Sequence, residues 1–242
     1  MARYGLDNFN EAGELIFSTD YPCMSLLTTA TMTGTDTPDY GAQVIDPLGF
    51  CMPQGLNQFC SPMTTFFNDQ GERANQLRVL TVDRNGNYVN GVPIKYGLFK
   101  RGATRGFDDY GLRTFSEDGV LTFDSSTPFL EVTGIAAAGD WVYVRRYGPN
   151  RGNADWSYIP SGEPFFYAYI YEVTLPQGTE FALVDTSYMY FANLNAQVFC
   201  YCGHDQDLTK FALMARVVST NPNNPPTASL KFPTVIFGRA SP

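Results

Sequence analysis

Apolar and polar residues follow the same pattern in two stretches of the chain, 4–22 and 110–128. The second stretch aligns with the first without a gap, at an offset of 106 residues. In each, a polar segment ends in glycine and leads into apolar residues two positions apart, which predicts a β-hairpin whose second strand has one apolar face. A repeat of this kind shows the unit of construction. Nine of the 19 positions are identical: Tyr4/Tyr110, Gly5/Gly111, Leu6/Leu112, Phe9/Phe115, Glu11/Glu117, Gly13/Gly119, Leu15/Leu121, Phe17/Phe123 and Pro22/Pro128.

The repeated residues also carry a resemblance. The pattern Y-G-L-x-x-F-x-x-x-G-x-L-x-F, present in both stretches, resembles the opening hairpin of small virion proteins of tailed bacteriophages, mostly proteins associated with the tail tip or tail fibre. The resemblance covers only the repeated residues of each copy. It implies a structural protein of the phage particle, whose partners are other virion proteins.

The rest of the chain has the pattern of many short strands separated by turn-forming residues. Glycine, proline and asparagine clusters interrupt the apolar runs, and no amphipathic helix of twelve residues or more is predicted. Residues 33–67 contain many turn formers and no sustained period, so we expect a long loop region with short strands there. Further strands are predicted at 24–32, 77–82, 88–94, 129–133, 140–147, 165–173, 179–185, 196–202, 210–218 and 230–237. Asn85-Gly86 favours a hairpin between the strands at 77–82 and 88–94.

These patterns predict an all-β protein of two related units, each resembling a β-sandwich or jelly roll with long loops. The polar, glycine-rich segment Lys100–Gly106 stands immediately before the second copy of the repeat. We therefore expect an N-terminal loop-rich β unit at 1–103 and a C-terminal β-sandwich unit at 107–242.

Charge and composition narrow the classes of partner. The net charge of −8 and the pI near 4.6 oppose binding to nucleic-acid phosphates. No apolar run is long enough for membrane insertion, and the first residues lack the apolar core of a signal peptide. An odd number of scattered cysteines argues against a disulfide framework and favours free thiols in a reducing compartment. We therefore expect assembly into the virion in the cytoplasm of a bacterial host. The five cysteines are Cys23, Cys51, Cys60, Cys200 and Cys202.

Neither a cofactor nor a metal site is predicted. The sequence Cys200-Tyr201-Cys202-Gly203-His204 suggests a metal site, but His204 is the only histidine and a zinc site requires four ligands. The acidic residues from His204 to Asp207 are too few for calcium and indicate a solvated turn. No glycine pattern typical of nucleotide binding and no nucleophile elbow occurs, so we expect no enzymatic activity.

One strand is unusually aromatic. On 165–171, Phe166, Ala168 and Ile170 share one face, which suits a core, while the other face is entirely aromatic. The area of that second face requires cover from loops, from the other unit or from another chain, so we expect a homo-oligomer or a tightly held subunit. The candidate interface or receptor-binding residues are Trp141, Trp156, Tyr158, Phe165, Tyr167, Tyr169 and Tyr171.

Three functions remain open on the sequence alone. The first is a structural virion protein of the tail tip, baseplate or fibre, with a capsid decoration protein as the rival position. The second is a carbohydrate-binding module for a host surface glycan, with Trp141, Trp156 and Tyr158 as stacking platforms; a host protein is the other receptor class. The third is a glycan-degrading enzyme using paired carboxylates such as Glu172 and Asp185.

Overall fold

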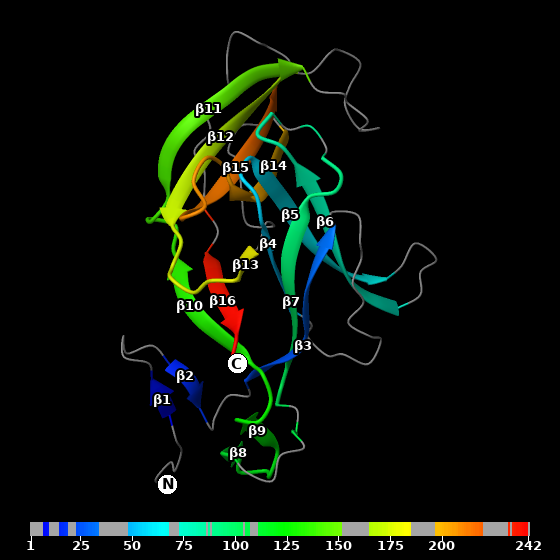
Figure 1. Cartoon of the computed structure of the whole chain (residues 1–242), viewed down its shortest axis with the longest axis vertical. Helices are drawn as coiled ribbons and strands as arrows, with labels where there is room; N and C mark the ends of the chain where they lie inside the picture. Colours follow the sequence, from blue (N-terminus) through cyan, green and yellow to red (C-terminus); the bar gives the residue numbers. More distant parts are fainter. Residues whose placement is uncertain are drawn as a thin grey trace.

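A computed structural model gives the architecture of most of the chain (Figure 1). The described residues are 7–9, 15–18, 23–33, 48–67, 73–85, 87, 89–103, 105–106, 111–151, 165–184, 197–219, 232 and 234–241.

The described residues form β-strands and turns without a helix, which confirms the predicted all-β class. Among them there is accordingly no helix of the length and apolarity needed to cross a membrane. Two hairpins and two six-stranded antiparallel sheets make up the fold. The first hairpin pairs β1 (Asp7–Phe9) with β2 (Leu15–Ser18), and the second pairs β8 (Arg113–Phe115) with β9 (Leu121–Asp124).

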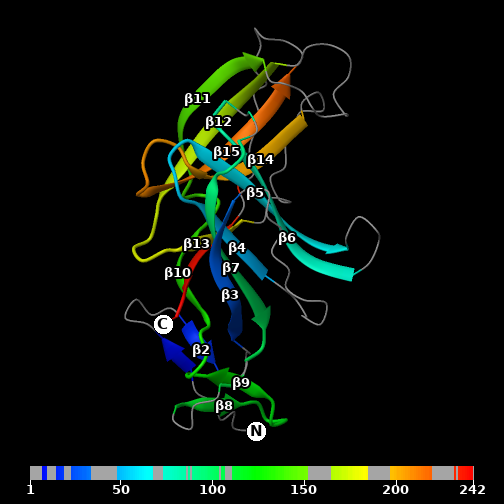
Figure 2. The same ribbon diagram turned by 45° about the vertical axis from the view of Figure 1, so that its right-hand side comes forward.

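The six-stranded sheets are named here sheet 1 and sheet 2. Sheet 1 has the order β10 (Leu130–Ala136), β16 (Val235–Ala240), β13 (Phe181–Val184), β4 (Leu48–Pro53), β7 (Pro93–Arg101) and β3 (Met24–Thr33). Sheet 2 has the order β11 (Val142–Arg151), β12 (Phe165–Thr174), β15 (Lys210–Ser219), β14 (Gln197–His204), β5 (Gln58–Phe67) and β6 (Arg73–Val82). Figures 1 and 2 show β11 and β12 towards one end of the molecule and both hairpins at the opposite end.

The two sheets enclose a common core, as in a β-sandwich. Side chains of sheet 1 such as Cys51, Leu98 and Phe237 pack with side chains of sheet 2 such as Phe211 and Leu213. Successive residues of a strand point to opposite faces, so their neighbours form a second cluster on the far face of each sheet. On sheet 1 that cluster centres on three mutually edge-on rings, Phe50, Phe99 and Phe181.

The pairing of the strands repeats between the two parts of the chain. β3 pairs with β7 as β10 pairs with β16, and each pair has an irregularity at the same place, between Leu26 and Thr28 and between Val132 and Gly134. The offset is 106 residues from β3 to β10, the same as in the sequence repeat, and 139 residues from β7 to β16.

The strand order is correspondingly symmetric. Sheet 1 reads the same from either edge towards its central β13–β4 pair, and in sheet 2 the β14–β15 pair mirrors β5–β6 across the β14–β5 contact. Among the strands that the structure describes, only β11 and β12 have no counterpart. Each six-stranded sheet therefore contains strands from both 1–103 and 107–242. The segment at 100–106 separates the two copies of the repeat in the sequence, but it does not separate the two sheets.

One expectation for the first part of the chain was wrong, and a second was right only in part. Residues 48–67, expected as loop with short strands, contain the core strands β4 and β5, and Phe50 and Cys51 are fully buried. β4 is buried on both faces, so its sequence lacks the alternation that reveals a half-exposed strand. The expected hairpin after β6 is confirmed at its turn only. Asp83 N donates to Asn87 O and Val89 N to Thr81 O (2.9 and 3.1 Å), but the next strand, β7, begins at Pro93 and joins the other sheet rather than pairing with β6.

Candidate interaction site

The two hairpins have the same backbone pairing. Asp7 pairs with Ser18 in the first and Arg113 with Asp124 in the second, again 106 residues apart. Each pairing then shifts by one residue before its last pair, which is Phe9 with Leu15 and Phe115 with Leu121. The prediction of matching hairpins is confirmed at the level of strand pairing.

A buried carboxylate fixes the second hairpin. The oxygens of Asp124 accept hydrogen bonds from Arg113 Nε (2.8 Å), Gly106 N (3.0 Å), and the amide and hydroxyl of Ser126 (2.9 and 2.6 Å). Burial raises the pKa of Asp124, but the bonds from Ser126, Arg113 and Gly106 outweigh it and hold the pKa well below its usual value of 3.8. The corresponding position in the first hairpin is Ser18, so this anchor belongs to the second hairpin.

The chain that leaves the first hairpin is bonded to the second. Cys23 N donates to Thr122 O (3.0 Å) and Leu26 N to Pro128 O (3.0 Å), both on the segment from β9 to β10. Phe123 of β9 is buried edge-on against Phe129, with 5.2 Å between ring centroids. The second hairpin is therefore docked on the body of the molecule through one face.

The second hairpin also exposes large apolar side chains. Leu112 is 45% exposed, Phe115 53% and Val120 61%, beside the exposed acidic residue Glu117 of its turn. Apolar area in a two-stranded element with an otherwise polar surface is typical of an interaction surface. These three apolar residues and Glu117 are called the hairpin patch below.

The aromatic strand β12 is buried largely within the chain. Ala168 and Ile170 are fully buried on one face, as expected. On the other face Tyr167 is only 1% exposed, with the Arg146 guanidinium 5.3 Å from its ring centroid, and Tyr171 lies edge-on to Phe232 and Tyr143. Burial, with smaller contributions from its tyrosine neighbours, raises the pKa of Tyr171 to about 12.

Tyr169 lies half-buried between these two tyrosines. Burial raises the pKa of its hydroxyl, against the opposing effect of Arg146. The side chain of Phe165 lies outside the described residues. The chain itself therefore covers much of the aromatic face that was expected to need a partner.

Trp141, one of the three expected stacking platforms, does not lie on the surface. Trp141 is 7% exposed and packs against Phe211 and Phe232, with ring centroids 6.4 and 6.2 Å away, so it is a core residue. Trp156 and Tyr158 lie outside the described residues. The pairing of β11 with β12 shifts at Val144, so Tyr143 pairs with Tyr171 and Arg145 with the next residue along β12, Ile170. A bulge of this kind is not visible in the hydrophobic pattern.

A polar cluster formed by β11 and the turns of sheet 2 was not foreseen. Its centre is the fully buried carboxylate of Asp205, which accepts hydrogen bonds from Tyr147 Oη at 3.0 and 3.2 Å and lies 3.3 Å from Arg145 Nη1 and 4.0 Å from Arg84 Nε. Asn57 Oδ1 accepts from Arg84 N and Nε, both at 2.7 Å. The cluster thus ties the β4–β5 and β14–β15 turns to the segment after β6.

Glu172 lies beside this cluster, with Oε1 4.0 Å from Arg145 Nη2. Burial raises its pKa, Arg145 opposes the rise, and the negative charge of Asp205 adds to it. The enzymatic alternative paired Glu172 with Asp185, which lies outside the described residues. Because Asp205 is engaged by Arg145 and Tyr147, the arrangement reads as a structural ion-pair network.

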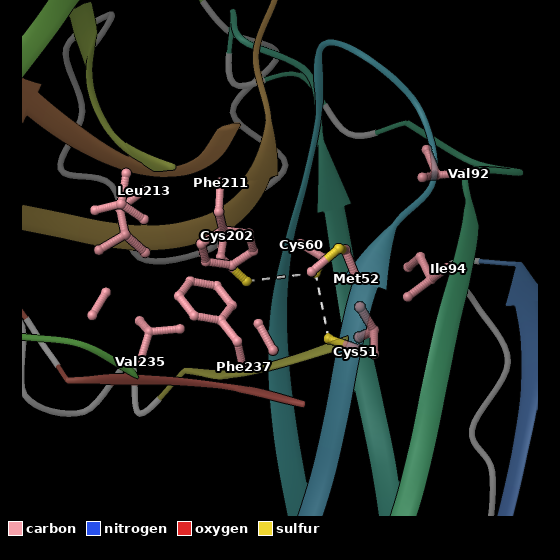
Figure 3. Packing of buried hydrophobic residues seen from close by; sticks show 14 of the residues in the cluster. Cys51, Met52, Cys60, Val92, Ile94, Cys202, Phe211, Leu213, Val235 and Phe237 are labelled. Atoms are coloured by element: carbon pink, nitrogen blue, oxygen red, sulfur yellow. Dashed lines mark hydrogen bonds between the residues drawn. The ribbon is translucent and has the colours of Figure 1, made fainter. Parts of the chain in front are cut away.

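Three cysteines meet in the core between the sheets (Figure 3). Cys60 Sγ lies 3.5 Å from Cys51 Sγ and 3.8 Å from Cys202 Sγ, and all three are fully buried free thiols. Burial and the neighbouring sulfurs raise the pKa of Cys60 well above its usual value. Contact with Cys60 lowers the pKa of Cys202, but burial and the neighbouring Cys51 together outweigh it, so this pKa is raised too. Cys23 is a half-buried free thiol, and the side chain of Cys200 lies outside the described residues.

His204 is also a structural residue. Its Nδ1 lies 2.7 Å from Lys210 O and its ring is edge-on to Phe211, and burial lowers its pKa. Within the part of the chain that the structure describes, His, Cys, Asp and Glu side chains form no group of three or more that could hold a metal ion.

Fold and surface together define a two-layer antiparallel β-sandwich with two matching hairpins at one end. No family model, curated protein or solved structure matches the chain. The hairpin patch was missed in the sequence because its residues were read only as parts of a folding unit. The signal was present: Leu112, Phe115 and Glu117 are identical in the other copy.

Proposed function

We propose that this protein is a non-enzymatic structural protein of a tailed-bacteriophage particle, placed at the tail tip, baseplate or fibre apparatus. The observation that carries the proposal is the hairpin motif, which occurs twice and has the same strand pairing in both copies. Its role is to make protein–protein contacts with other virion proteins and, where it reaches the host, with a surface glycan or protein.

The physical properties of the chain support this role. Two sheets that share one core form a rigid body, and a rigid body can hold surface elements in a fixed arrangement. The net charge of −8 keeps a protein that is made in quantity soluble and away from packaged nucleic acid.

A homo-oligomer is part of the proposal, and the edge strand β11 supports it. β11 is the outer strand of sheet 2, and its residues Val142, Tyr143 and Val144 are all exposed. An exposed apolar edge strand is a template for pairing with another chain. Replacing Tyr143 with Asp is expected to lower the oligomeric state in analytical ultracentrifugation, whereas the same change at Leu208, exposed on the β14–β15 turn, leaves it unchanged.

The test of the function is the composition of purified particles. The chain is expected at a copy number that is a small multiple of the tail symmetry and in isolated tails rather than in isolated heads. Absence from the particle refutes the proposal. Presence in hundreds of copies on the head replaces it with the capsid decoration role.

A further inference from the structure

One of the four edge strands of the two described sheets differs in charge from the other three. The edges are β3 and β10 in sheet 1 and β11 and β6 in sheet 2. Charged residues on an edge strand oppose its pairing with a further chain. β6 and β10 contain charged residues, and in β11 Arg145 and Arg146 follow the exposed apolar start. β3, with the sequence MSLLTTATMT, has no charged residue along its whole length.

The repeat makes β10 the counterpart of β3, and β10 is the protected one of the two. Glu131 of β10 accepts hydrogen bonds from Arg239 Nε and Nη2 at 2.8 and 2.7 Å. The turn after β12 lies against β10, since a Cβ on Gly134 would come within 2.6 Å of Pro176 Cγ. The position that corresponds to Gly134 in β3 is Thr28, which is exposed. The same edge is therefore covered in one half of the repeat and open in the other.

β3 is held firmly at both ends and is exposed between them. Ser25 is 1% exposed and its hydroxyl donates to Gly102 O (2.7 Å), and Met32 is 4% exposed in the core between the sheets. Residues 27–31 between them are all exposed. Because successive side chains of a strand point to opposite faces, neither face of β3 is covered there. Pairing with β7 along the whole strand keeps this exposed stretch in an extended geometry (Figure 1).

The outer edge of β3 is paired only where the strand begins. Ser25 forms a bridge with Phe129, and Leu26 N donates to Pro128 O (3.0 Å). Along 27–31 the described part of the chain supplies no strand on that side. The outward N–H and C=O groups of this stretch can therefore extend sheet 1 by one more strand.

We infer that β3 pairs with β3 of a second copy of this chain, antiparallel about a two-fold axis at Ala30, so that sheet 1 continues through both copies. The axis places Ala30 opposite Ala30 and Thr29 opposite Thr31, a favourable cross-strand pair. Identical residues meet in a two-fold contact, so an edge without charge suits a second copy of a chain whose net charge is −8.

The inference rests on the homo-oligomer of the proposed function and adds a contact in sheet 1 to the one proposed at β11. The test therefore uses the Tyr143→Asp chain, which lacks the β11 contact, and measures its mass by analytical ultracentrifugation. This chain is expected to be a dimer. Adding Ala30→Lys or Ala30→Glu brings like charges together on the axis and is expected to raise the dissociation constant at least about 100-fold. An equimolar mixture of the two variants is expected to restore the dimer, because opposite charges then meet.

Ile135→Lys in the same background is the matched control. Ile135 is 60% exposed on β10, at the position that corresponds to Thr29 of β3, and its replacement is expected to leave the dimer intact. Circular dichroism checks that every variant is folded; lysine is a usual residue on exposed edge strands. A loss of the dimer in Ile135→Lys equal to that in Ala30→Lys would indicate pairing of β3 with β10 and overturns the inference.

Three other outcomes overturn the inference as well. They are a monomeric Tyr143→Asp chain, whether β3 then stays free or binds a different protein, a dimer that survives both Ala30 variants, and folded Ala30 variants whose mixture stays monomeric. None of these bears on the place of the protein in a phage particle, which the composition of purified particles tests. A lower mass for Tyr143→Asp than for the unchanged protein supports the contact at β11 whatever happens at β3.

Discussion

At the scale of single residues, Gly203 shows how closely the two parts of the chain approach. It lies on β14, paired with Phe59 of β5. A Cβ on Gly203 would overlap the backbone oxygen of Gln58 and lie 3.0 Å from Phe59 Cα. The backbone of one strand, rather than a movable side chain, leaves no room for any other residue there.

Gly203→Ala is therefore expected to destabilise the protein by about 1–3 kcal/mol, since the strands must separate to accept the methyl group. Urea unfolding followed by circular dichroism measures the change. Gly139→Ala is the matched control, because a Cβ at this turn between β10 and β11 meets no atom within 4 Å. Equal stability of the two variants would contradict the close approach of β14 and β5.

His204 gives a second prediction, and its signals are unambiguous because it is the only histidine. Burial lowers its pKa below the usual value of 6.5. Since the unfolded chain then binds the proton more readily, the contribution of His204 to stability is present above pH 6.5 and is lost as the pH falls through the folded-state pKa. Titration of the imidazole proton by NMR is expected to give a pKa below 6.5, and a value above it would contradict the burial.

The thiols give a third prediction. Cys51, Cys60 and Cys202 are fully buried, so they should react far more slowly with a disulfide reagent than the half-buried Cys23. In denaturant all five cysteines of the sequence should react. The double variant Cys23→Ser, Cys200→Ser keeps only the three described core thiols. Rapid reaction of this folded variant would show that the space between the sheets is open.

At the scale of elements, what the sequence predicts depends on how many faces of a strand are buried. The alternating and aromatic runs predicted β12 and β15 nearly to their ends, and the repeat predicted both hairpins. β4 is buried on both faces, and β5 follows it without a clear period, so both were missed. Among the candidate site residues, Trp141 and Tyr167 were expected to be exposed but are buried. Aromatic content alone does not distinguish a core strand from an interface strand.

Interactions between turns that are distant in the sequence could not be predicted from local sequence patterns either. Asp205, Arg84 and Arg145 meet only once the sheets are assembled, so no spacing in the sequence indicates their cluster. The bulge at Val144 likewise depends on the pairing of β11 with β12.

The element-scale prediction concerns the anchor of the second hairpin. Asp124→Asn removes the charge that Arg113 and two backbone amides engage, and is expected to destabilise the hairpin by about 1–3 kcal/mol at pH 7. Hydrogen exchange of peptides from 111–124 measures this loss of stability. We expect these peptides to exchange about 10- to 100-fold faster than in the unchanged protein. Asp118→Asn, in the exposed turn, is the control.

The pH dependence of this difference follows from the pKa of Asp124. Because the folded-state pKa lies below 3.8, its stabilising effect is present above that pH and is lost as the pH falls below it. The exchange ratio between Asp124→Asn and the unchanged protein is therefore expected to be constant from pH 7 to pH 5 and to shrink below about pH 4. A ratio independent of pH would mean that the ionised carboxylate does not hold the hairpin.

At the scale of the whole molecule, the repeat divides the chain into two halves, whereas the sheets and the core join these halves. The repeat gives each half its own hairpin and its own set of matching strands. The sheets nevertheless join the halves at β13–β4 and β14–β5, and the core cluster between the sheets contains Met32, Cys51 and Leu98 together with Phe211 and Phe237. A half on its own would expose the apolar surface that the other half now covers.

We therefore expect the two halves to unfold together in one transition. Peptides from β4 and β7 and peptides from β13 and β16 should lose hydrogen-exchange protection at the same urea concentration, although they lie on opposite sides of residues 100–106. Each half buries its apolar residues against the other, so unfolding of one half would remove part of the stability of the other. Gly203→Ala supplies a check within the same experiment, since a defect at the β14–β5 contact should lower the urea midpoint of both sets of peptides equally. Two separate transitions, or a midpoint that moves in one half only, would show instead that 1–103 and 107–242 are independent folding units.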